Sequence, residues 1–156
     1  MKMRSLIILS IAVALCWVFS SRGSQAQLNN AALQDETLAR VGGRVEDFLR
    51  EIARDNVDEG IDDLLVRSPL LKDGKRVSQL KESIRREMQK YGVFMGVESL
   101  KLERVGRSII RCVYLYHCQE FPVVWQATFY RAEEEGDWML ISLKFNVEYE
   151  KLPAGQ

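Results

Sequence analysis

Hydrophobic residues recur at three- and four-residue steps in the first half of the chain, which predicts amphipathic helices. The clearest stripe runs from residue 38 to residue 52. Its members are Leu38, Val41, Val45, Phe48, Leu49 and Ile52. Gly42 and Gly43 interrupt this stripe and lower its helix propensity by roughly 1 kcal/mol each. We therefore expect a kink there, or a close contact between this helix and a sheet.

The sequence predicts two shorter helices after this one. Asp58 has the chemistry of an N-cap for the first of them, and Pro69 is expected to end it. A turn at Asp73-Gly74 precedes the next helix, which we expect to begin at Ser78 and to end at Gly92.

From Met95 onward the hydrophobic period changes to two, which is typical of strands with one buried face. The predicted strands cover residues 95–104, 108–118, 122–132 and 137–149. Turns this short join neighbouring strands into an antiparallel meander. The sequence thus predicts an α+β fold with three N-terminal helices packed on a curved, cone-like sheet of four antiparallel strands.

The alternation also predicts a register. Cys112 is expected to face Ala127 and Trp125 to face Phe145, while Leu100 and Leu102 join Cys112 and Ile110. One sheet face then collects thirteen side chains: Leu100, Leu102, Ile110, Cys112, Tyr114, Trp125, Ala127, Phe129, Met139, Ile141, Leu143, Phe145 and Val147. In this register Phe129 faces Ile141. The opposite face mixes polar residues with Val and Leu, which indicates either a sheet-to-sheet homodimer or ordinary exposed strand residues.

The first 26 residues have the pattern of a secretory signal peptide. Lys2 and Arg4 precede an uncharged apolar run, and Ser24-Gln25-Ala26 presents small residues where a signal peptidase cleaves. The apolar run is shorter than the roughly 20 residues of a membrane-spanning helix, although an uncleaved anchor is the competing interpretation. We expect export to the periplasm or the medium of a bacterium, with no membrane association after cleavage. A flexible segment (27–35), the folded domain (36–150) and a tail (151–156) would follow.

Charge and cysteine content narrow the possible functions. Without the leader the chain has 19 basic and 22 acidic residues, a formal charge of −3, and the charges are interspersed. This composition gives no indication of nucleic-acid binding. Cys112 and Cys118 on one strand would be about 20 Å apart, which predicts free, buried thiols instead of a disulfide.

Packing motifs in the last third resemble those of small exported bacterial proteins of the nuclear-transport-factor-2-like, or cystatin-like, superfamily. These motifs are Phe121-Pro122-Val123-Val124-Trp125, Ala127-Thr128-Phe129-Tyr130-Arg131, Trp138-Met139-Leu140-Ile141-Ser142 and Phe145-Asn146. The resemblance covers residues 36–150. It implies a fold in which helices and a curved meander enclose a cone. The similar proteins have no assigned activity.

Some enzymes of that superfamily, such as ketosteroid isomerases and dehydratases, place an Asp, His or Tyr inside the cone. The corresponding hypothesis here is that Glu98, facing Tyr114, acts as a base among aromatic residues. The alternative is structural: Glu98 is solvated, and Tyr114 and Tyr116 bury their rings and leave their hydroxyls at the rim. If the cone binds a ligand, we expect Tyr114, Tyr116, Trp125 and Phe129 to line it.

Other site types find less support in the sequence. His117 is expected on the outer sheet face, where it suits neither a base in the cone nor, with two distant cysteines, a zinc site. The acidic stretch from Asp55 to Asp63 lacks calcium-loop spacing because Val57 falls where an oxygen ligand is needed. We therefore expect no metal or other cofactor. The sequence favours a non-catalytic exported domain that binds a small apolar ligand or a protein partner, or forms a dimer, with the Glu98 enzyme as the alternative.

Overall fold

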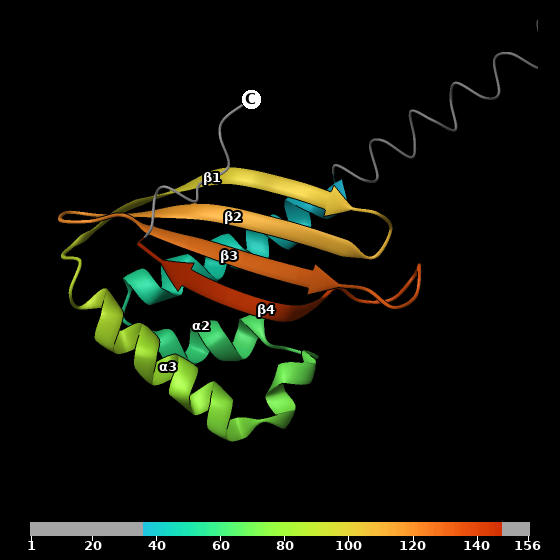
Figure 1. Cartoon of the computed structure of the whole chain (residues 1–156), viewed down its shortest axis with the longest axis horizontal. Helices are drawn as coiled ribbons and strands as arrows, with labels where there is room; N and C mark the ends of the chain where they lie inside the picture. Colours follow the sequence, from blue (N-terminus) through green and yellow to red (C-terminus); the bar gives the residue numbers. More distant parts are fainter. Residues whose placement is uncertain (1–35, 148–156) are drawn as a thin grey trace, which may run out of the picture. The chain divides into compact units, whose positions relative to one another are not determined.

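Three α-helices, one 3-10 helix and a four-stranded antiparallel sheet make up residues 36–147, the part of the chain that the computed structural model describes (Figure 1). This is an α+β fold, as predicted. Residues 38–147 belong to one structural unit, which is described below. The predicted leader, the flexible segment 27–35, the tail and residues 148–149 of the last predicted strand lie outside the described residues.

The helices contain the predicted apolar stripes, although two of their starting points differ from the prediction. Residues 36–53 are helical, and α2 covers Val57–Leu64 with Asn56, not Asp58, at the N-cap. The 3-10 helix η1, Pro69–Lys72, was not predicted. Helix α3 spans Gly74–Met88, so it begins four residues before Ser78. Its actual cap is Asp73, whose carboxylate accepts a hydrogen bond from the backbone N–H of Arg76 at 3.0 Å.

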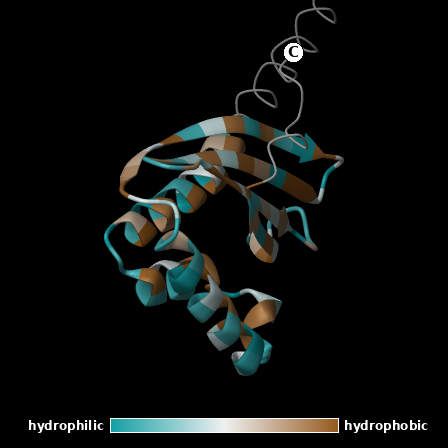
Figure 2. Cartoon of the chain, turned by 60° about the vertical axis from the view of Figure 1, so that its left-hand side comes forward, coloured by the Kyte–Doolittle hydropathy of each residue, from teal (hydrophilic) through white to brown (hydrophobic). Residues whose placement is uncertain are grey.

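The four strands lie close to their predicted positions. They are β1 (Phe94–Val105), β2 (Ile109–Cys118), β3 (Val123–Tyr130) and β4 (Met139–Asn146), and their order in the sheet follows their order in the chain. Strands β1 and β4 are therefore the two edges. Figure 2 shows hydrophobic and hydrophilic residues alternating along the strands, which is the pattern that located them in the sequence.

The predicted register is correct for β2 with β3 and for residues 124–128 of β3 with β4, and three register irregularities shift it elsewhere. Cys112 faces Ala127 and Trp125 faces Phe145, as expected. A bulge in β4 puts Leu140, not Ile141, opposite Phe129. In β1, Leu102 pairs with Cys112 instead of Ile110, and the register shifts between Ser99 and Lys101.

The hydrophobic core lies between the helices and one face of the sheet. It joins the stripe of the first helix and residues of α2 and α3 to the inner side chains of the strands. The bulge in β4 brings Leu140 and Trp138 into this core, where Ile141 and Met139 were predicted. Val147, also predicted to be buried, is exposed.

The outer face of the sheet is more charged than its sequence pattern suggested. On β1 and β2, Lys101 and Arg111 both pair with Glu103, at 2.8 and 3.5 Å. Val124, on β3, is the most buried side chain of this face and lies outside the main core cluster. Within residues 36–147, no helix is both long and apolar enough to cross a membrane.

Candidate functional site

The inner sheet face, where the sequence placed a ligand site, is filled by side chains. Tyr114, Trp125 and Phe129 have no exposed surface, and Tyr116 is 3% exposed. Trp125 packs edge-on against Phe48 at 5.3 Å between ring centroids. Its ring also stacks at 4.8 Å on Phe145. None of the grooves described below is lined by the four predicted ligand residues, so this face acts as core.

The predicted pairing of Glu98 with Tyr114 is wrong. Glu98 lies opposite Leu115, and Tyr114 lies opposite Ser99. Because neighbouring residues of a strand point to opposite faces, the Glu98 side chain is on the outer face and Tyr114 is on the inner one. The carboxylate of Glu98 is 59% exposed and lies 3.2 Å from Nε2 of His117. The structure does not bring the two proposed catalytic groups together.

Tyr114 is nevertheless an unusual core residue. Its hydroxyl is completely buried, contrary to the expectation that it would lie at the rim. Burial is the main cause that raises the pKa of Tyr114, and the nearby Glu46 carboxylate adds to the effect. A phenol with a raised pKa remains protonated, so Tyr114 is a poor base. Tyr116 stacks on Phe94 at 4.7 Å, and burial raises its pKa as well.

The two cysteines and the single histidine lie where the sequence placed them. Cys112 and Cys118 are both free and lie six residues apart on β2, the first buried and the second half-buried. His117 is on the outer face beside Glu98. Among residues 36–147, no group of three His, Cys, Asp or Glu side chains has an arrangement suited to a metal ion.

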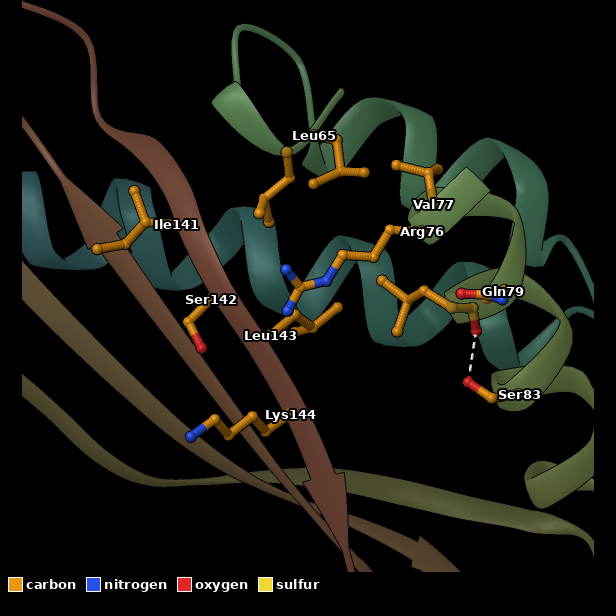
Figure 3. Close-up of a pocket in the computed structure, with 11 residues that line it drawn as sticks. Leu65, Arg76, Val77, Gln79, Ser83, Ile141, Ser142, Leu143 and Lys144 are labelled. Carbon is orange, nitrogen blue, oxygen red and sulfur yellow. Dashed lines mark hydrogen bonds between the residues drawn. The ribbon is translucent and has the colours of Figure 1, made fainter. Parts of the chain in front are cut away.

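A groove of about 460 Å³ lies between α3 and the edge strand β4 (Figure 3). Its apolar lining comes from the end of α2, from η1, from one face of α3 and from β4: Leu65, Leu70, Val77, Leu80, Ile141 and Leu143. Arg76, Gln79, Ser83, Ser142 and Lys144 contribute its polar groups. We call this cavity the α3–β4 groove.

The elements around the α3–β4 groove explain why it is open. Within residues 36–147, strand β4 ends the sheet, so one of its sides has no neighbouring strand. At one point that edge is closed by Ser68, a buried residue whose hydroxyl donates to the Leu140 carbonyl at 2.5 Å. Beyond this contact, residues 141–144 border the groove. An uncovered strand edge presents unpaired backbone N–H and C=O groups, and small-molecule sites combine such groups with apolar side chains.

Arg76 is the charged group best placed in the α3–β4 groove. It leaves the first turn of α3, and its guanidinium lies beside Leu143 of β4 (Figure 3). Lys144 lines the same groove but points away from α3 (Figure 3). Within residues 36–147, neither side chain forms an ion pair. The sequence did not identify either residue as part of a site. A single Arg in a helix, or a single Lys in a strand, does not indicate that the two elements lie opposite each other.

Comparison of the chain with protein-family models, with curated proteins and with solved structures found no match. The function therefore has to be argued from the residues of this chain.

Proposed function

We propose that this chain is a non-catalytic binding module that holds a small, mainly apolar carboxylic acid in the α3–β4 groove. The observation that carries the proposal is the position of the Arg76 guanidinium in a groove that also has six apolar lining side chains (Figure 3). The filled inner face supports a non-catalytic role, because it leaves no room for a substrate beside Tyr114.

The size and lining of the groove favour a small ligand. Its volume of about 460 Å³ falls in the range of roughly 300–1,000 Å³ that is usual for small-molecule sites. Leu80 and Leu143 are only half-buried, although both pack against the core. Covering such side chains is favourable by about 25 cal/mol per Å² of apolar surface.

The charge of the groove favours an acid over a neutral ligand. Arg76 and Lys144 line the groove, and no Asp or Glu among residues 36–147 does. A guanidinium binds a carboxylate through two parallel hydrogen bonds, which would fix the acid end of the ligand. The apolar end would then lie along Val77, Leu80 and Ile141.

Three broader proposals accompany this one. We infer export from the signal-peptide pattern of residues 1–26. The nuclear-transport-factor-2-like resemblance and its cone rest on the sequence motifs, together with a layout of helices beside a four-stranded meander. A homodimer through the outer sheet face is supported by the Val and Leu residues there, and it is opposed by the ion pairs around Glu103.

Octanoate and its uncharged counterpart 1-octanol test the function. We expect octanoate to shift the amide NMR signals of residues 141–144 and of α3 in a saturable way, and 1-octanol to bind more weakly. Arg76→Gln should weaken octanoate binding by about threefold to tenfold, the effect of losing one partly exposed charged contact. The same substitution should leave 1-octanol binding unchanged.

A matched pair of tryptophan substitutions controls for the apolar part of the groove. Leu80→Trp adds bulk inside the groove and should abolish binding of both ligands. Leu71→Trp adds the same bulk at an exposed position of η1 outside the groove lining and should have no effect. Octanoate binding that is equal in the unmodified chain and in the Arg76→Gln and Leu80→Trp variants would exclude this groove as the site.

A further inference from the structure

A second groove, separate from the α3–β4 groove, is rich in arginine. Its volume is also about 460 Å³. It lies between the first helix, the end of α2 and the segment that precedes β4, and its lining residues are Arg40, Val41, Arg44, Asp63, Val66, Arg67, Asp137 and Trp138. We call it the arginine groove.

Arg40 and Arg44 lie one turn apart on the same helix. Arg44 is half-buried, donates to the carbonyls of Trp138 and Leu64 at 2.6 and 3.1 Å, and lies over the Phe129 ring. Burial lowers the pKa of Arg44, and the charge of Arg40 lowers it further. Arg40 is exposed, and no carboxylate among residues 36–147 pairs with it. Two like charges therefore lie one helical turn apart in the wall of this groove.

Trp138 provides the second, independent observation. It is only 4% exposed, and its buried indole N–H has no hydrogen-bond partner in the described part of the chain. The guanidiniums of Arg131 and Arg104 lie 4.8 and 5.5 Å from the centre of its ring. The Nε–H of Arg104 is buried and unpartnered too. Leaving a buried donor without an acceptor is unfavourable, so an acceptor brought to the Trp138 N–H would be stabilised there.

The acidic residues nearby do not supply that acceptor. Arg67 forms an ion pair with Asp137, so these two charges offset each other. Asp63 is then the one lining carboxylate left to balance Arg40 and Arg44. The neighbouring loop contains Glu133, Glu134 and Glu135, and none of them pairs with an arginine in the described part of the chain. The groove keeps an excess of positive charge.

We propose that the arginine groove binds the carboxylate of a small organic acid, with Arg40 and Trp138 as the recognition residues. An organic acid fits better than a bare inorganic anion because Val41, Val66 and the Trp138 ring give the groove an apolar wall. Arg44 positions this site by tying the helix to the backbone of Trp138. The proposal does not depend on the ligand suggested for the α3–β4 groove.

The indole N–H signal of Trp138 in NMR spectra of the purified protein reports on this site directly. Sodium benzoate, benzamide and sodium phosphate serve as the probes, added at constant ionic strength. We expect benzoate to shift the Trp138 signal in a saturable way and to leave the signal of fully buried Trp125 unchanged. Benzamide, which has the same shape without the charge, should produce no saturable shift.

Two substitutions of exposed arginines complete the test. Arg40→Gln should weaken benzoate binding by about threefold or more, as expected for the loss of a charged contact. Arg107→Gln, in the turn between β1 and β2, lies outside the groove lining and should change nothing. The proposal fails if benzamide binds as well as benzoate, or if Arg40→Gln binds benzoate normally. Phosphate binding of equal strength would overturn the assignment to an organic acid.

Discussion

Two adjacent glycines of the first helix have opposite structural roles. A Cβ atom on Gly42 would lie 2.9 Å from the hydroxyl of Tyr114 and 3.0 Å from a methyl of Leu102. A Cβ on Gly43 would meet nothing within 4 Å. Gly42 therefore lies at a close approach of the helix to the sheet, while Gly43 only lowers helix propensity.

Alanine at the two positions should change stability in opposite directions. We expect Gly42→Ala to lower the free energy of unfolding by about 1–3 kcal/mol, the usual effect of overpacking a core. Gly43→Ala should raise it by roughly 0.5–1 kcal/mol. Urea denaturation followed by circular dichroism measures both. Introducing Tyr114→Phe removes the nearest clashing atom, so Gly42→Ala should be less destabilising in that background. Equal effects of Gly42→Ala and Gly43→Ala would contradict the close contact.

Predictions about single residues were correct where one clear sequence pattern determined the position of the residue. The glycine pair did mark a close helix–sheet contact, but the pattern could not tell which of the two makes it. Glu98 was misplaced because the turn lies at residues 106–108, one position later than expected, and because a bulge near Leu100 adds one residue to β1. Each added residue shifts the pairing, and a shift of one moves a side chain to the other face.

At the scale of elements, ion pairs join α2 to α3. Asp58, in the first turn of α2, pairs with Arg85 and with Lys81 of α3. Lys81 also pairs with Asp62 at 2.7 Å. The hydrogen bond from Arg85 is the main cause that lowers the pKa of Asp58 below its ordinary value of 3.8. The pair is solvent-exposed, so its contribution to stability is small.

This lowered pKa predicts how acid affects the contact between α2 and α3. A carboxyl group whose pKa is lowered by folding stabilises the folded state at every pH above its ordinary pKa. This stabilisation is lost as the pH falls through the lower pKa that the group has in the folded state. Asp58→Asn should therefore reduce the urea midpoint slightly near neutral pH. The difference from the unmodified chain should disappear well below pH 3.8.

Glu59→Gln is a matched control for this pH dependence, because Glu59 lies beside Asp58 in the first turn of α2 and forms no ion pair with the described residues. It should show no comparable deficit near neutral pH. A deficit of Asp58→Asn that stays constant from neutral to strongly acidic pH would show that the ion pair is not its cause.

The order of the elements was predictable because hydrophobic period and turn residues are local properties. The bulge in β4 was not, since one extra residue leaves the alternation on either side intact. It exchanges Ile141 for Leu140 in the core and brings Trp138 inward. The same inward position of Trp138 helps to form the arginine groove, so a site was missed together with the bulge.

At the scale of the whole folded unit, the sequence predicted the core better than it predicted the surface. Core positions follow from periodicity, and most of the first-helix stripe and of the inner faces of β2 and β3 is buried as expected. Both grooves depend on how elements distant in the chain lie beside one another. Arg76 meets Leu143 in one groove, and Arg44 meets Trp138 in the other. A local sequence pattern does not specify which residues from distant elements lie side by side.

Cys112 offers a probe of the cooperativity of this core. It is 1% exposed, and burial raises the pKa of its thiol to about 12. Because the thiolate is the reactive form, alkylation requires both exposure and ionisation, and the folded state provides neither. Cys112 should therefore react with iodoacetamide only through unfolding. The dependence of its rate on urea should equal that of global unfolding.

Half-buried Cys118 should react faster, through local opening of the end of β2. Peptide mapping by mass spectrometry resolves the two sites. Equal rates at both cysteines in the absence of urea would show that the sheet around Cys112 opens without global unfolding.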